Sequence, residues 1–328
     1  MAPGSPNWTP TSMTEKIRLG ISACLLGQKV RYDGGHKLDR FITDTLGKYV
    51  DFVPVCPEVE CGLGIPREAM RLVGNPAQPR LVTVRSGIDY TDRMLDWAQK
   101  RVRELEKEGL CGFIFKSDSP SSGMERVKVY GLSGSPAKTG VGLFARTFME
   151  HFPLLPVEEE GRLHDPVLRE NFIDAIFTLK RYREMLATEE GRKALVDFHT
   201  RHKLLIRAHS LDHLREMGKL VAQAAALPVA ELYDRYQKLL LEALKRKTTC
   251  KKNTDVLYHL MGYFKTDLSA DEKQELRELI DLYHRGLIPL IVPVTLISHY
   301  VRKYDQPYLK GQWYLHPHPM ELQLRNHV

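Results

Sequence analysis

Three short apolar segments in the first half of the chain constrain its fold more than any other feature. Turn residues or charges bound each one, and the segments are KIRLGISACLL from Lys16, DFVPVCP from Asp51 and CGFIFKS from Cys111. Such runs predict buried β-strands. Between the second and third lies a stretch, residues 89–110, with apolar residues at roughly helical spacing. Strand, helix and strand in this order predict a parallel sheet with a right-handed crossover.

The composition changes at FPLLPVEEEGRLHDP, residues 152–166, which we interpret as a linker. Beyond it, long segments carry apolar residues at a spacing of 3.6 and begin with polar residues, a pattern typical of helices. We therefore expect an α/β amino-terminal domain with a parallel sheet over residues 13–155, followed by an all-α domain over residues 163–328. Residues 1–12, rich in Pro, Ser and Thr, are expected to form a disordered leader.

Composition limits the compartment and the partners. No run of about 18 apolar residues exists, so we expect no membrane-spanning segment. Five cysteines in 328 residues, without a secretory signal, favour a reducing, cytoplasmic location. The formal net charge of +7 favours a polyanionic partner such as a nucleic acid, although a merely basic protein has the same balance. Nothing in the sequence indicates an obligate protein partner.

Residues capable of chemistry follow all three predicted strands. Cys24 follows the first strand, Cys56 the second with Glu58 two residues on, and the loop SDSPSSG the third. The carboxyl ends of parallel strands lie at one edge of a sheet, so we expect Cys24, Cys56 and residues 119–123 to converge. Converging thiolates suit iron or iron–sulfur sites. The spacing alone, which is not a CxxC pair, favours two buried, unreactive cysteines.

The segments ISACLLGQKVRYDGGHK, PVCPEVECGLGIPRE and GFIFKSDSPSSG resemble the thiouracil desulfidase family, which uses a 4Fe-4S cluster to remove sulfur from thiolated uracil. The second half, with FHTRHKLLIRAH and YLHPHPMELQLRNHV, resembles the helical domain of the bacterial tRNA 4-thiouridine desulfidases. Both resemblances run in order along the chain from about Met13. Together they imply non-redox removal of sulfur from 4-thiouridine in tRNA to give uridine.

The resemblance also implies a set of cluster ligands. In the desulfidase family three cysteines hold three irons and leave the fourth iron open. Two of these cysteines correspond to Cys24 and Cys56, but in the third pattern, SPxCG, this chain has Ser122. An alkoxide is harder and more basic than a thiolate, so the cluster is expected to be labile or absent. Cys61 or Cys111 could substitute, and we expect Cys61, five residues after Cys56, to be better placed.

Glu58 and Ser119 match the functional pair of the family. The resemblance implies that the open iron binds the thiocarbonyl sulfur as a Lewis acid. A carboxylate, here Glu58, then activates the attacking water. A hydroxyl, here Ser119, transfers the proton at the ring nitrogen. From the residues alone, a salt bridge for Glu58 and a capping role for Ser119 are simpler explanations.

Two basic segments of the helical half are candidates for contact with tRNA. EALKRKTTCKKNT holds five basic residues against one acid, and FHTRHKLLIRAH gathers more within about three helical turns. A solvated helix surface explains either segment alone, but together with the net charge they favour nucleic acid. The candidate RNA-binding residues are Arg201, Lys203, Arg207, Lys245, Arg246, Lys247, Lys251 and Lys252.

Two alternatives stay open. The same chemistry could act on free thiouracil or a similar small thiolated compound, which needs no phosphate contacts. Ser122 also fits a nucleic-acid-binding protein that has lost its cluster. Salt-sensitive binding of tRNA distinguishes the first alternative from the main hypothesis.

Overall fold

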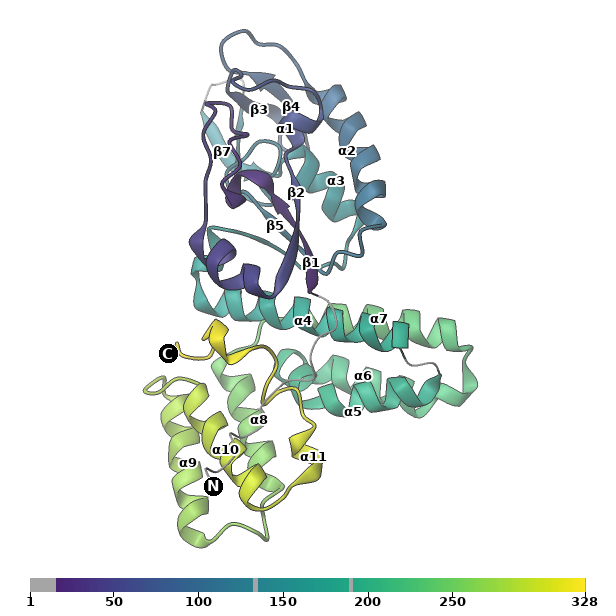
Figure 1. Ribbon diagram of the computed structural model, residues 1–328, viewed down its shortest axis with the longest axis vertical. Coiled ribbons are helices and arrows are strands. Elements are labelled where there is room, and N and C mark those ends of the chain that lie inside the picture. The colour runs from purple at the N-terminus through teal and green to yellow at the C-terminus, as the bar shows by residue number, and fades with distance from the viewer. Residues whose placement is uncertain (1–15, 132–134, 189–190, 328) are drawn as a thin grey trace, which may run out of the picture.

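The structure, a computed structural model, describes residues 16–131, 135–188 and 191–327. The expected leader, residues 1–12, lies outside these ranges. Figure 1 shows the strands gathered in one half of the molecule and helices α8 to α11 in the other, with α4 and α7 between the two. This arrangement confirms the predicted fold class, an α/β region followed by a largely helical one.

Sheet A is the predicted parallel sheet. Its strands lie in the order β2-β1-β5-β8, and every neighbouring pair is parallel. The three apolar runs supply three of its strands. The inner strands β1 and β5 are almost wholly buried, as inner strands of a parallel sheet are, whereas Asp51 and Pro54 of the edge strand β2 are exposed. The strands are β1 (Ile17–Ser22), β2 (Val50–Val55), β5 (Phe113–Phe115) and β8 (Val157–Glu159).

Helices cover sheet A and form the second half of the chain. Phe144 on α3 packs edge-on against Phe113 of β5, with 5.8 Å between the ring centres. In the part of the chain that the structure describes, no helix combines the length and apolar character needed to cross a membrane. The helices are α1 (Pro57–Glu60), α2 (Thr91–Glu106), α3 (Leu143–His151), α4 (Pro166–Thr188), α5 (Arg192–His209), α6 (Leu211–Ala222), α7 (Val229–Leu244), α8 (Cys250–Gly262), α9 (Ala270–His284), α10 (Ile291–Lys303) and α11 (Pro307–Lys310).

The stretch interpreted as a linker, residues 152–166, contains β8. This strand pairs with β5, and the hydrophobic core of sheet A continues into α4, α5 and α7. The core therefore joins the two halves rather than stopping at the change in composition. The domain bounds of 13–155 and 163–328 stay a proposal, and they leave β8 outside both domains.

Sheet B is a second sheet that the sequence pattern did not lead us to expect. Its order is β4-β3-β6-β7, with β3 antiparallel to β4 and parallel to β6. The sequence contains one signal for β3 and β4. Two apolar runs lie on either side of Asn75 and Pro76, and Asn-Pro marks a turn. Sheet B matters for function because the segment leading into β3 forms a wall of the site described below. Its strands are β3 (Met70–Asn75), β4 (Gln78–Thr83), β6 (Val127–Tyr130) and β7 (Pro136–Gly140).

Candidate active site

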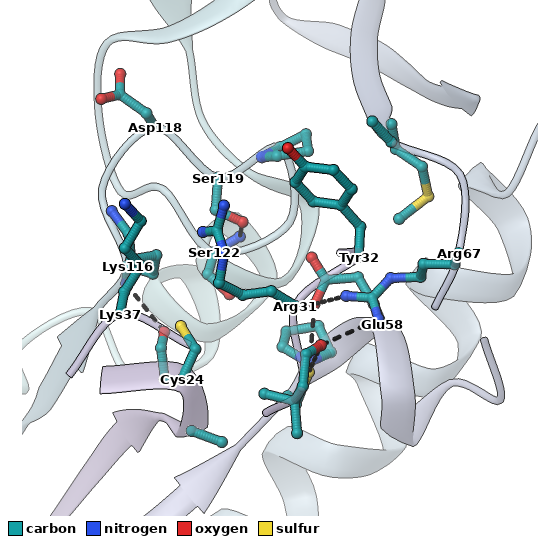
Figure 2. A pocket seen from close by; sticks show the side chains of 18 of the residues that line it. Cys24, Arg31, Tyr32, Lys37, Glu58, Arg67, Lys116, Asp118, Ser119 and Ser122 are labelled. Carbon is teal, nitrogen blue, oxygen red and sulfur yellow. Dashed lines mark hydrogen bonds and ion pairs between the residues drawn. The ribbon is translucent and has the colours of Figure 1, made fainter. Parts of the chain in front are cut away.

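A cavity of about 470 Å³ opens at the carboxyl edge of sheet A (Figure 2). Its walls are the residues that follow β1, β2 and β5, together with the segment Arg67–Met70 that leads into β3. Parallel strands bring these segments together because all their carboxyl ends lie at one edge. The catalytic and cluster-binding residues predicted from the sequence all line this cavity, namely Cys24, Cys56, Glu58, Ser119 and Ser122.

Cys24 and Cys56 present two buried thiols to the cavity. The residues are 9% and 8% exposed. Burial raises the pKa of Cys24 to about 11 and that of Cys56 to about 12. The backbone N–H of Cys56 donates to Glu60 Oε1 at 2.8 Å, which fixes this thiol at the start of α1. Buried thiols of this kind ionise when a cation binds the sulfur.

Ser122 occupies the third ligand position and is 3% exposed. The donor set at this edge is therefore two thiols and one hydroxyl. Within the described ranges, no group of three or more His, Cys, Asp or Glu side chains could hold a metal ion. Because a hydroxyl is a harder donor than a thiolate, this set does not fit a 4Fe-4S cluster held by three protein thiolates.

The structure brings neither Cys61 nor Cys111 to that third position, contrary to the expectation for Cys61. The thiol of Cys61 donates to the carbonyl oxygen of Glu58 at 3.3 Å, and its side chain packs with the buried residues of sheet B. The reason is α1, which turns the chain so that Cys61 faces away from the cavity. Cys111 precedes β5 and donates its N–H to Arg18 at 2.9 Å, at the opposite edge of sheet A.

A chain of hydrogen bonds connects Ser119 with Glu58. The Ser119 and Ser121 hydroxyl oxygens lie 3.0 Å apart, and the Ser121 hydroxyl donates to Glu58 Oε1 at 2.5 Å. The other oxygen of Glu58 lies 3.5 Å from the Cys56 thiol and 3.7 Å from Arg67 Nη2. Ser121 is fully buried, and we did not anticipate this link because only the fold places it over Glu58.

The simpler explanations for Glu58 and Ser119 are also present. Glu58 forms the ion pair with Arg67, and the Ser119 hydroxyl accepts the backbone N–H of Ser122 at 3.1 Å, as a turn cap does. These contacts are compatible with catalysis, since a carboxylate and a hydroxyl must be held in place to act. Their catalytic roles stay predictions.

The serine loop is held against the start of α3. The N–H groups of Leu143 and Ala145 donate to the carbonyl oxygens of Pro120 and Ser121, at 3.2 and 3.1 Å. Gly142 allows this close approach, because a Cβ atom there would lie 2.5 Å from the Ser121 carbonyl carbon and oxygen. The loop position therefore depends on a glycine outside the loop.

We expect Gly142→Ala to lower the free energy of unfolding by about 2 kcal/mol, because a methyl group forced against backbone must displace it. Urea denaturation followed by circular dichroism measures this change. The control is Gly218→Ala in α6, where a Cβ atom meets nothing within 4 Å. Equal denaturation midpoints for Gly142→Ala and the unsubstituted protein would show that the loop is not packed as described.

Four of the candidate RNA-binding residues make contacts within the protein, three by polar contacts and one by a cation–π contact. Arg207 Nε pairs with Asp255 at 2.8 Å, and Lys252 Nζ donates at 2.7 Å to the carbonyl oxygens of His209 and Lys247. Lys245 Nζ donates to the carbonyl oxygen of Pro153. Arg201 lies over the Trp313 ring, with 5.2 Å to its centre. Lys203 is partly exposed. Arg246 and Lys247 of the α7–α8 connection and Lys251 in the first turn of α8 are exposed.

The α7–α8 connection lies at the amino edge of sheet A, because Lys245 contacts Pro153, which precedes β8. The cavity lies at the carboxyl edge. One strand length separates the two edges, which for a six-residue strand is about 20 Å. A single base is too small to contact both.

The fold and the cavity define a class, an α/β protein whose parallel strands end in a cavity lined by thiols, a carboxylate and hydroxyls. Residues 19–160 match the 2-thiouracil desulfurase family, and residues 203–319 match a family of proteins of unknown function, DUF1722. The chain belongs to the family of YbgA-like proteins. It joins a 2-thiouracil desulfurase domain to a DUF1722 domain. The resemblance to thiouracil desulfidases is thereby confirmed at the level of the family.

Three known proteins are similar to parts of the chain. The uncharacterized protein YbgA of Escherichia coli K12 is 35% identical over 155 residues, which are 47% of this chain and 90% of YbgA. The uncharacterized protein YbbK of Bacillus subtilis 168 is 30% identical over 111 residues, 31% of this chain and 71% of YbbK. The solved structure of the 4Fe-4S-dependent thiouracil desulfidase TudS is 31% identical, covers 46% of this chain and 95% of its own, and has a TM-score of 0.39.

Proposed function

We propose that this protein removes sulfur from 4-thiouridine in tRNA to give uridine. The observation that carries the proposal is the gathering of Cys24, Cys56, Glu58, Ser119 and Ser122 around one cavity. The match of residues 19–160 to the 2-thiouracil desulfurase family supports the reaction type. The basic helical half supports RNA as the carrier of the thiolated base.

The reaction exchanges a thiocarbonyl for a carbonyl group. Water supplies the oxygen, the carbon–sulfur bond breaks, and both protons of the water leave with the sulfur as hydrogen sulfide, so no oxidant or reductant is consumed. Glu58 takes a proton from the attacking water. The Ser119 hydroxyl, linked to Glu58 through Ser121, hydrogen-bonds the ring and passes a proton along this chain.

An iron–sulfur cluster belongs to this proposal because TudS is a 4Fe-4S-dependent enzyme. Cys24 and Cys56 are the thiols that would hold it here. Ser122 provides oxygen where a third thiolate is needed, so we expect this chain to hold a cluster weakly or not at all. The unsubstituted protein is accordingly expected to be much less active than a variant with three thiols.

The test of function uses tRNA that contains 4-thiouridine and the Ser122→Cys variant, reconstituted anaerobically with iron and sulfide. Nucleoside analysis after incubation is expected to show loss of 4-thiouridine and an equal gain of uridine. Free 2-thiouracil serves as the competing substrate. Conversion of the free base alone would favour the small-molecule alternative, and conversion of neither would contradict the desulfidase proposal.

The exposed cations of the α7–α8 connection and of the first turn of α8 provide a test of RNA binding. Replacing Arg246, Lys247 and Lys251 together by glutamine is expected to reduce the slope of log affinity against log salt by about 2, since each phosphate contact adds about 0.7–0.9. Filter binding of tRNA at several salt concentrations measures the slope. A matched control replaces by glutamine the exposed Lys100 and Arg103 of α2 and Lys107, which directly follows this helix. If the slope of log affinity against log salt is the same in the two triple variants, Arg246, Lys247 and Lys251 do not contact the tRNA.

Ser122 favours a second candidate function, a nucleic-acid-binding protein without a cluster. In that case the unsubstituted protein binds tRNA, and Ser122→Cys neither takes up iron nor changes the tRNA. Iron uptake and tRNA conversion by Ser122→Cys therefore distinguish the two functions.

A further inference from the structure

Tyr32 lies in the wall of the cavity and is unusually accessible for a large side chain there. The residue is 44% exposed, and in the part of the chain that the structure describes it alone among the exposed large apolar residues lines the cavity. Figure 2 shows its ring among the side chains that surround the opening. The described residues provide no hydrogen-bond partner for its hydroxyl group. The ring is thus neither core packing nor an internal hydrogen-bonding group.

The backbone of Tyr32 is held on both sides. Its carbonyl oxygen accepts the N–H of Arg67 at 2.9 Å, which ties it to the segment leading into sheet B. The turn around it is closed by the N–H of Arg31, which donates to Gly35 at 3.2 Å, and the N–H of Gly34, which donates to Arg31 at 3.0 Å. An exposed ring on a fixed backbone loses little freedom when a flat ligand stacks on it.

One cation lies beside this ring, and a second lines the same cavity. The guanidinium carbon of Arg31 lies 5.5 Å from the ring centre of Tyr32. Arg31 is 3.5 Å from Asp33, a pair in which both side chains are partly exposed and the interaction is weak. Lys37 also lines the cavity, with an exposed side chain, and its backbone N–H donates to Cys24 at 2.9 Å. Arg31, Tyr32 and Lys37 all belong to one short segment, residues 31–37.

We propose that the uracil ring of the substrate stacks on Tyr32 and that its adjoining phosphate is received by Arg31 and Lys37. Aromatic rings commonly receive a base that has left its stack, and stacking tolerates any base because every base has a π face. Arg31 and Lys37 recognise the phosphate, a group that a free base does not have. The ligand class is therefore a nucleotide unit of RNA, and this identity rests on the proposed function.

The test measures binding, not sulfur removal, and uses the full chain with Ser122 in place. The probe is 4-thiouridine 5′-monophosphate, with its Kd measured by calorimetry. Tyr32→Ala is expected to weaken binding about tenfold to a hundredfold, in line with the loss of one base–aromatic stack. Tyr32→Phe keeps the ring and is expected to bind within about threefold of the unsubstituted protein, because the ring face provides the contact.

Near-ultraviolet irradiation gives a second readout, because a thiolated uracil cross-links to groups in contact with it. We expect the cross-linked peptide to contain Tyr32. The matched control is Tyr263→Ala, which removes a residue that is 37% exposed at the end of α8, where it stacks on Tyr308. This control is expected to change neither the Kd nor the cross-link.

Equal binding by Tyr32→Ala and the unsubstituted protein, or cross-links confined to the helical half, would overturn the stacking role. Binding of the nucleoside 4-thiouridine as tight as that of its monophosphate would overturn the phosphate role of Arg31 and Lys37. Failure of the proposed function looks different, because Ser122→Cys then leaves thiolated tRNA unchanged while the nucleotide still binds through Tyr32.

Discussion

The Ser122→Cys variant is expected to bind about four irons per chain after anaerobic reconstitution, the content of one 4Fe-4S cluster, while the unsubstituted protein retains few or none. The substitution changes one donor atom from oxygen to sulfur at a buried position beside Cys24 and Cys56. Sulfur donors hold iron–sulfur clusters more strongly than oxygen donors do. Iron and acid-labile sulfide per chain, measured after desalting, check this result.

Two further variants show whether the added iron is in the cavity. Cys24→Ala in the Ser122→Cys background removes a thiol of the cavity and is expected to abolish iron binding. Cys61→Ala in the same background is expected to leave it unchanged, because Cys61 does not line the cavity. If Cys61→Ala releases the iron, or if Ser122→Cys binds no more iron than the unsubstituted protein, the assigned ligand positions are wrong.

The second large effect is expected at Glu58. In the Ser122→Cys background, Glu58→Gln should slow sulfur removal by about 10²–10⁴-fold, the usual contribution of a general base. Glutamine keeps the shape and can still accept the hydrogen bond from Ser121, but it cannot take a proton from water. Single-turnover release of sulfide from thiolated tRNA measures the rate.

Iron content and the Kd for 4-thiouridine monophosphate are expected to stay the same in Glu58→Gln, so that only the rate falls. Glu60→Gln is the matched control, since Glu60 lies on the same short helix α1 but does not line the cavity. Its side-chain oxygen can still accept the N–H of Cys56 after the substitution. A rate for Glu58→Gln equal to that of Glu60→Gln would exclude Glu58 as the base.

Part of the fold was predictable because its signals are local and strong. The apolar runs that became β1, β2 and β5 are nearly continuous, and the inner strands β1 and β5 are buried on both faces. Sheet B was missed because its strands are only partly buried and less continuously apolar, and β3 pairs with β6 more than 50 residues away in sequence. The turn at Asn75 and Pro76 was a local signal for β3 and β4, but no local pattern shows that β3 pairs with β6.

The sequence by itself determined which segments meet at the carboxyl edge of sheet A, because parallel strands place everything that follows them at one edge. Only the tertiary structure decided which side chains face the cavity. It turned Cys61 into the core of sheet B, placed Ser121 over Glu58, exposed the ring of Tyr32 and engaged Lys245 with Pro153. The direction of a side chain depends on turns and on packing against distant segments, and these contacts exist only once the chain has folded.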